Sequence, residues 1–232
     1  MSRAAPMLRR DLGWTLAALL LILLWEWSGL DLAAVRLWGG ASGFAWREAW
    51  LTSKLLHEGG RMLAWVILAL MVLDAWRLWL DGPSRHERVQ AIAASLLAVL
   101  LVPAIKRVSS TSCPWDLAEF GGVARYVPHW QLGVLDGGAG HCFPSGHAAA
   151  GFAFFSLYLL WRGHRPRLAR WMLLAVLGLG AIFGMAQMAR GAHYPSHSMW
   201  SAWLCWVLVW LVQSAPGWRF NPARARPRPE AT

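Results

Sequence analysis

The chain has 232 residues, of which 57% are hydrophobic and 15% charged, and 18 are tryptophans. This composition excludes an ordinary soluble domain and is typical of a protein embedded in a membrane. The net charge is +10, but the basic residues lie in separate loops rather than on one face, which argues against nucleic-acid binding.

A helix that crosses a bilayer needs roughly 20 mostly apolar residues. The first candidate follows Arg9 and Arg10, and its apolar run is followed by Trp25, Glu26 and Trp27 in place of a small-residue cleavage site. We therefore expect a retained helix rather than a removed signal peptide. Six stretches qualify in all: Leu12–Leu30, Met62–Trp79, Val89–Ile105, Ala148–Trp161, Trp171–Met188 and Met199–Val212.

Arginines mark alternate loops: before the first span, between the second and third, between the fourth and fifth, and after the sixth. By the positive-inside rule these segments and both termini are cytoplasmic. Residues 31–61, 106–147 and 189–198 then face outward. The sequence predicts an all-α, polytopic membrane protein, a six-transmembrane-helix bundle that forms a single domain over residues 1–232. We expect residues 216–232 to be a disordered cytoplasmic tail.

The segment "FAWREAWLTSKLLHEGGRM", between the first two spans, alternates apolar and polar residues at near-helical spacing. This pattern favours a helix lying along the outer interface. Its Lys54, His57, Glu58 and Arg61 are most simply a solvated face. The alternative is that they contribute to a site.

The outward loops hold three polar clusters, "KRVSSTSCPWDL", "HCFPSGH" and "QMARGAHYPSH", which the topology brings to one side of the membrane. Residues 144–147, before an Ala-rich run, predict a helix start whose unpaired amides favour an anion. Lys106 and Arg190 add positive charge, and Gly146 allows close backbone approach. A phosphate suits these donors. The alternative makes Ser145 an N-cap and leaves His147 facing lipid headgroups.

Two histidines on one phosphate suggest a mechanism. A neutral imidazole can attack phosphorus and form a phosphohistidine, while a second protonates the leaving oxygen and later activates water. No metal or other cofactor is expected. His141 and His147 lie six residues apart across a Pro-Ser-Gly break, and Pro195 argues against a helical pair of His193 and His197.

These motifs resemble the type 2 phosphatidic acid phosphatase superfamily, six-helix membrane enzymes that dephosphorylate lipids. The family signatures are Lys-x6-Arg-Pro, Pro-Ser-Gly-His and Ser-Arg-x5-His-x3-Asp. The second is complete at residues 144–147. In the first, Lys106 is followed by six residues and then by Cys113 and Pro114, so a cysteine stands where the family has arginine.

In the third signature, His193 aligns with the family nucleophile and His197 takes the position of the orienting aspartate. Ala186 and Gln187 stand at the Ser-Arg positions, and the nearest arginine is Arg190. The match runs from Lys106 to His197, with all three signatures in order.

The resemblance implies that His193 is the nucleophile, His147 the general acid and His197 the orienting residue. It also implies that the phosphate is held by Lys106, Ser145, Gly146 and Arg190. A neutral imidazole at position 197 can accept a hydrogen bond but cannot stabilise an imidazolium as a carboxylate does. Asp116, Glu119 and Glu58 are the candidates to supply that charge from other loops.

The implied function is metal-independent hydrolysis of a lipid phosphomonoester or diphosphate, with the active site on the outer side of a bacterial inner membrane. Candidate substrates include undecaprenyl diphosphate, phosphatidylglycerol phosphate, phosphatidic acid and lipid A phosphates, and nothing in the sequence separates them. Lipid-to-lipid phosphotransfer and a catalytically impaired, headgroup-binding relative are the alternatives. A transporter is disfavoured, because the polar groups cluster at one interface rather than at mid-membrane.

Cys113 and Cys142 fall in the same outward loop, where a disulfide can persist. A bridge between them would tie the first two signatures together; two free thiols are the alternative, because pairing cannot be deduced from sequence. Cys205 falls within the last span, where we expect a small buried residue.

Overall fold

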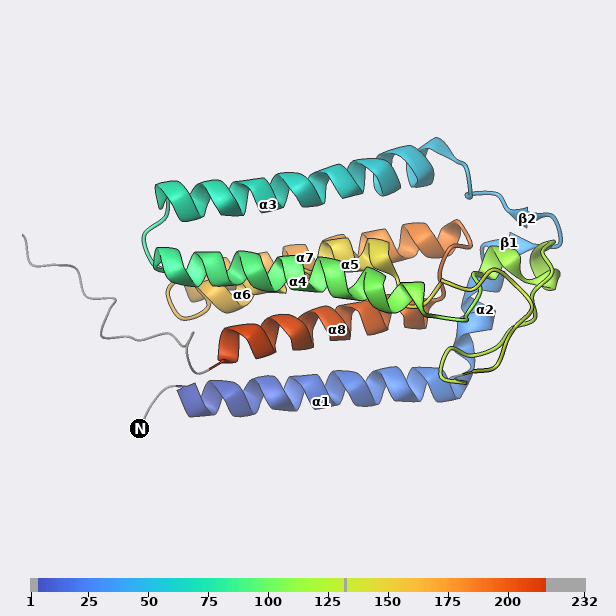
Figure 1. Ribbon diagram of the computed structural model, residues 1–232, viewed down its shortest axis with the longest axis horizontal. Coiled ribbons are helices and arrows are strands. Elements are labelled where there is room, and N and C mark those ends of the chain that lie inside the picture. Colours follow the sequence, from blue (N-terminus) through green and yellow to red (C-terminus); the bar gives the residue numbers. More distant parts are fainter. Residues whose placement is uncertain (1–3, 132, 216–232) are drawn as a thin grey trace, which may run out of the picture.

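The computed structural model describes residues 4–131 and 133–215; the predicted tail, residues 216–232, lies outside them. Long helices run side by side along the molecule (Figure 1). The main helices are α1 (Ala4–Ser28), α2 (Leu30–Arg36), η1 (Leu51–Gly59), α3 (Gly60–Arg77), α4 (Arg85–Arg107), α5 (Gly146–Phe152), α6 (Phe155–Trp161), α7 (Pro166–Ala189) and α8 (Pro195–Ser214). Short elements between them are β1 (Gly39–Gly40), β2 (Gly43–Phe44), η2 (Pro114–Asp116) and η3 (Ala118–Phe120).

The protein is mostly helical, as predicted. By length and composition, three helices in the described part of the chain can cross a membrane: Leu51–Arg77, Arg85–Arg107 and Pro166–Ala189. α1 and α2, bent by 73° at Gly29, make a fourth if the pair counts as one span. These helices indicate a membrane protein, with three or four of the six predicted spans meeting the criterion.

The prediction that the segment before Met62 lies along the interface is wrong from Leu51 onward. There the chain continues through the π-helical turns of η1 into α3 as one helix of 27 residues. Its alternating pattern arises because one side of η1 packs against α7. Sequence spacing alone does not distinguish a helix that faces protein from one that faces lipid headgroups.

Small side chains allow the helices to approach closely, a common feature of helix contacts in membranes. Ala91, Ala94 and Ala98 of α4 are fully buried. A Cβ atom built on Gly151 of α5 would lie 2.7 Å from the Cα atom of Gly180 in α7, so these two backbones touch. This contact sets the spacing between α5 and α7.

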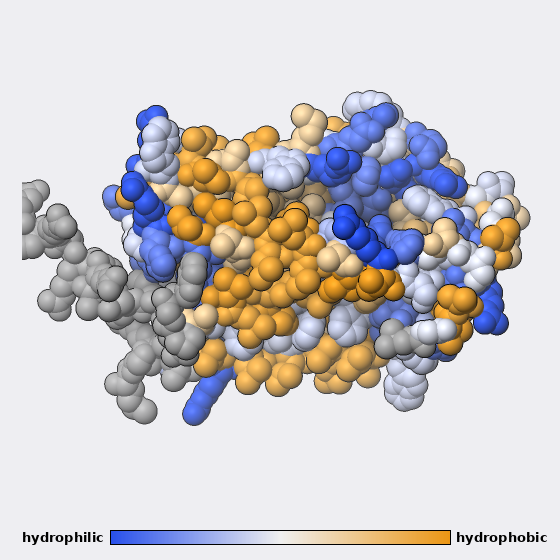
Figure 2. All heavy atoms as spheres, in the orientation of Figure 1, coloured by the Kyte–Doolittle hydropathy of each residue, from blue (hydrophilic) through white to orange (hydrophobic). Residues whose placement is uncertain are grey.

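The two ends of the helix bundle differ. The N-terminal end of α1 and the α3–α4 and α6–α7 connections lie at one end, whereas α2, the β1–β2 hairpin and the loops that follow α4 and α7 lie at the other (Figure 1). An apolar band separates the two ends on the face shown in Figure 2. Large apolar side chains are exposed along the helices, among them Leu21, Met62, Trp65, Leu100, Trp171 and Met185. The three loops predicted to share one side of the membrane do lie at the same end.

We predict that Gly151→Ala destabilises the bundle by about 1–3 kcal/mol, because the added methyl group must push α5 and α7 apart. Gly178→Ala is the matched control, since a Cβ atom there meets nothing within 4 Å. Thermal unfolding in detergent should show a lower Tm for Gly151→Ala and an unchanged or higher Tm for Gly178→Ala. Equal Tm values for the two variants would contradict the close α5–α7 contact.

Candidate active site

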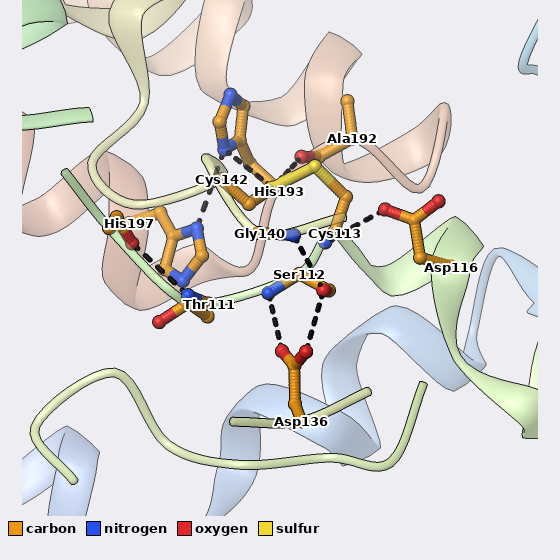
Figure 3. Close-up of a disulfide and its surroundings, with 11 residues drawn as sticks. Thr111, Ser112, Cys113, Asp116, Asp136, Gly140, Cys142, Ala192, His193 and His197 are labelled. Carbon is orange, nitrogen blue, oxygen red and sulfur yellow. Dashed lines mark hydrogen bonds between the residues drawn. A yellow bond between two sulfur atoms is a disulfide. The ribbon is translucent and has the colours of Figure 1, made fainter. Parts of the chain in front are cut away.

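A disulfide joins Cys113, just before η2, to Cys142, just before α5 (Figure 3). Hydrogen bonds order the surrounding loop. The backbone N–H of Cys142 donates to Thr111 O at 2.9 Å, and the buried Asp136 accepts from the backbone N–H of Ser112 at 2.6 Å and from its hydroxyl at 2.8 Å. The loop between α4 and α5 is therefore tied both covalently and by a buried carboxylate.

His193 packs against this disulfide, in the turn between α7 and α8 (Figure 3). Its Nδ1 lies 3.4 Å from Nδ1 of His197 and 3.6 Å from Sγ of Cys142. The two histidines are only 3% and 1% exposed. Pro195 starts α8 after His193, so the pair is not a helical i, i+4 pair, yet the turn still brings the two rings together.

The surroundings favour a neutral His193. Burial, and next the positive charge of Lys106, hold the pKa of His193 well below its usual range. Lys106 itself is half-buried in the last turn of α4. An uncharged imidazole thus lies in the field of a cation.

His147, in the first turn of α5, is buried at the same end of the bundle. Its Nε2 lies 2.9 Å from the carbonyl oxygen of Leu56, to which it can donate. Its Nδ1 is buried without a hydrogen-bond partner in the part of the chain that the structure describes. The ring stacks on Phe183 of α7, with centroids 4.5 Å apart. A Cβ atom on Gly60 would come within 3.2 Å of the His147 ring, so the glycine leaves room for it.

Ser145 is the N-cap of α5 and accepts a hydrogen bond from the backbone N–H of Ala148 at 3.4 Å. The capping role, considered above as the alternative, is therefore present. It does not use the hydroxyl hydrogen, because the oxygen acts as the acceptor. Gly146 follows as the first residue of α5.

Arg190 lies at the C-terminus of α7 and contacts Gln187, which stands where the sequence resemblance implies an arginine. Its guanidinium donates to Gln187 Oε1 at 3.5 Å and to the carbonyl oxygen of Arg47 at 2.8 Å. Gln187 also lies 3.2 Å from His57 Nδ1, and the His57 ring is 4.5 Å from that of His147. His57 therefore belongs to this cluster, whereas Lys54 pairs with Glu58 on the surface, as a solvated face would.

The three carboxylates considered as replacements for the family aspartate each bind elsewhere. Glu58 pairs with Lys54 at 2.8 Å, Glu119 pairs with Arg36 at 2.6 Å, and Asp116 accepts from the backbone N–H of Cys113 at 3.2 Å. The expectation that one of them supplies the charge is therefore wrong. Each side chain meets a partner near its own helix or helical turn, and the group that meets His193 is His197 itself.

Two other carboxylates, which the sequence did not indicate as site residues, contact neighbours of His197. Asp31 accepts hydrogen bonds from the backbone N–H of Ser196, at 3.0 Å, and from the Ser196 hydroxyl. Both bonds anchor the first turn of α8. Glu26 lies 3.4 Å from Nε2 of His129, and the His129 ring meets that of His197 edge-on, with centroids 5.8 Å apart. Burial lowers the pKa of His129 to about 4.

The family model of the PAP2 superfamily matches residues 88–221, more than half of the chain, and covers all the residues discussed above from Lys106 to His197. No curated protein and no solved structure matches the chain.

We predict that Cys113 and Cys142 resist alkylation in unreduced, denatured protein that was produced in an oxidising compartment. After reduction both should alkylate, while Cys205 should react with or without the reductant once the chain is unfolded. Mass spectrometry of the peptides measures this directly. Alkylation of both Cys113 and Cys142 before reduction would refute the bridge.

Proposed function

The chain belongs to the PAP2 superfamily, which includes phosphatases acting on phosphate esters, and from this membership we propose that it is a membrane lipid phosphatase. The substrate is a lipid phosphomonoester or diphosphate, and the reaction passes through a phosphohistidine. The observation that carries the proposal is the buried contact between Nδ1 of His193 and Nδ1 of His197, beside the cation Lys106.

In the first step, Nε2 of His193 attacks phosphorus. Two features support this role. The ring is neutral, so its lone pair is available. Its Nδ1 is engaged with His197, which leaves Nε2 as the attacking atom and holds the ring plane in one orientation.

As His193 attacks, the bond to the leaving oxygen breaks, and that oxygen takes a proton from His147. The support is that Nε2 of His147 is bonded to the carbonyl of Leu56 while Nδ1 is buried and has no partner among the described residues. Nδ1 is thus the nitrogen that can carry and return the proton. In the second step His147 removes a proton from water, which displaces His193 from phosphorus and releases phosphate.

The charge on the transferring phosphoryl group is stabilised by Lys106, the Ser145 hydroxyl, the amide of Gly146 and Arg190. Arg190 stands one helical turn from the position of the family arginine and already contacts Gln187 there. The departure at position 197 has a consequence: a second imidazole orients His193 but stabilises its positive charge less well than a carboxylate. No metal takes part in these steps.

The site's place in the fold supports a lipid substrate. The site lies at one end of the bundle, beyond an apolar band, so a phosphate could bind there while acyl or prenyl chains stay in the bilayer. We propose six spans in one domain over residues 1–232, with α1, α8 and the α5–α6 pair completing the set, and with the site on the outer side of a bacterial inner membrane. Transfer of the phosphoryl group to another lipid shares the first step.

We predict that His193→Ala and His147→Ala each reduce phosphate release by about 10³-fold or more, since each removes a group that takes part in bond making or breaking. Purified protein is incubated with a panel of lipid phosphates, and inorganic phosphate is measured. His141→Asn is the control, because His141 is an exposed histidine in the loop that leads into α5. A rate within a few-fold of wild type for either catalytic variant would overturn the role of that residue. A chelator should leave the rate of the disulfide-bonded protein unchanged.

We predict that Arg190→Lys lowers the turnover rate about 10-fold and Arg190→Ala about 10²-fold, because lysine offers a point charge in place of two parallel N–H donors. On the Arg190→Ala background, Gln187→Arg should recover part of the rate. Steady-state kinetics of the three variants test this. Near-normal turnover by folded Arg190→Lys would show that Arg190 does not clamp the phosphate.

A further inference from the structure

Cys142, His193 and His197 form a cluster of the residue types that bind metal ions. One ligand atom from each residue lies within 4.8 Å of the others, and all three residues are buried. The proposed reaction uses the imidazoles but not the sulfur. That sulfur is bonded to Cys113, and it is the thiolate, not a disulfide, that binds metal ions.

Two of the three distances between ligand atoms in this cluster match those of a tetrahedral zinc site. Zn–S bonds of about 2.3 Å and Zn–N bonds of about 2.0–2.1 Å place sulfur and nitrogen about 3.6 Å apart and two nitrogens about 3.3 Å apart. The structure has 3.6 Å between Cys142 Sγ and His193 Nδ1, and 3.4 Å between the two Nδ1 atoms. Thiolate and imidazole together select zinc over magnesium or calcium, which prefer oxygen.

We propose that the Cys113–Cys142 disulfide keeps a zinc site closed. When the bond is absent, the Cys142 thiolate and Nδ1 of His193 and of His197 bind Zn²⁺, and the Cys113 thiolate supplies the fourth ligand. A dithiol reductant opens the bond: each cysteine sulfur gains one electron and one proton, and the dithiol is oxidised to its own disulfide. Zinc binding then releases the two thiol protons.

The consequence for activity rests on the proposed function. A metal ion on Nδ1 of His193 leaves the remaining ring proton on Nε2, so Nε2 loses the lone pair that attacks phosphorus. Zinc therefore inactivates the thiol form, and oxidation of Cys113 and Cys142 keeps the nucleophile free of metal. Both cysteines lie in a loop proposed to face the oxidising side of the membrane, where the bond persists.

Two variants distinguish the role of Cys142 as a metal ligand from the loss of the disulfide. Cys113→Ser leaves Cys142 as a free thiol beside both histidines, whereas Cys142→Ser breaks the same bridge but removes the ligand. Each is purified in detergent with a phosphine reductant and titrated with Co²⁺, followed by competition with Zn²⁺. We expect Cys113→Ser to bind one equivalent with a thiolate-to-cobalt charge-transfer band and tetrahedral visible bands. Cys142→Ser and unreduced wild type should lack that band, and adding His197→Ala to Cys113→Ser should weaken binding at least 10-fold.

Absence of the charge-transfer band in folded Cys113→Ser, or an equal band in Cys142→Ser, would overturn the proposal. If Cys113→Ser does not fold, reduced wild type takes its place in the same titration, with the zinc retained after desalting measured by mass spectrometry; no retained zinc is then the contrary result. Because these readouts do not depend on catalysis, they separate this proposal from the proposed function. Zinc should also stop phosphate release by Cys113→Ser, and a chelator should restore it.

Discussion

The geometry of the site depends on one covalent bond, the Cys113–Cys142 disulfide, because three distant parts of the chain meet on it. It joins the loop after α4 to the residues that lead into α5, and His193, from the turn after α7, packs on its sulfur. Lys106, His147 and His193 thus come from three helix ends that the bridge and its neighbours hold together. By the resemblance, the arginine of the first signature is replaced here by Cys113. A disulfide therefore takes the place of a charged side chain.

Beneath the bridge, the helices are positioned by contacts between small residues and by buried carboxylates. The backbone contact of Gly151 with Gly180 sets α5 against α7, and Asp31 anchors the first turn of α8 next to His197. The π-helical η1 adds the Leu56 carbonyl, which holds His147. The Asp31 and Leu56 contacts hold the first turns of α8 and α5, and the proposed chemistry takes place at those helix ends.

The sequence was sufficient to predict the family and the meeting of the three polar clusters, since helices that alternate in direction bring every second loop to the same end. It was not sufficient for contacts that depend on which side of a helix faces inward. His57 could not be distinguished from a solvated residue until η1 was seen to continue into α3 and pack on α7. Glu26 and Asp31 carry no local motif, and they reach the site only because α1 and α2 bend around the start of α8. The replacement of the aspartate was misjudged because all three candidate carboxylates have other partners. Asp116 and Glu58 bind groups three or four residues away in the chain, and Glu119 pairs with Arg36 of α2.

The central claim is that His193 forms a covalent bond to phosphorus, and trapping that intermediate tests it most directly. Disulfide-bonded protein is mixed with a ³²P-labelled lipid phosphate, quenched within its first turnovers at alkaline pH, where phosphohistidine survives, and digested for mass spectrometry. We predict label on the peptide that contains His193, with none in His193→Ala, and a larger labelled fraction in His147→Ala when the leaving group needs no protonation. Hydrolysis without any labelled histidine, or label on a histidine other than His193, would contradict the account.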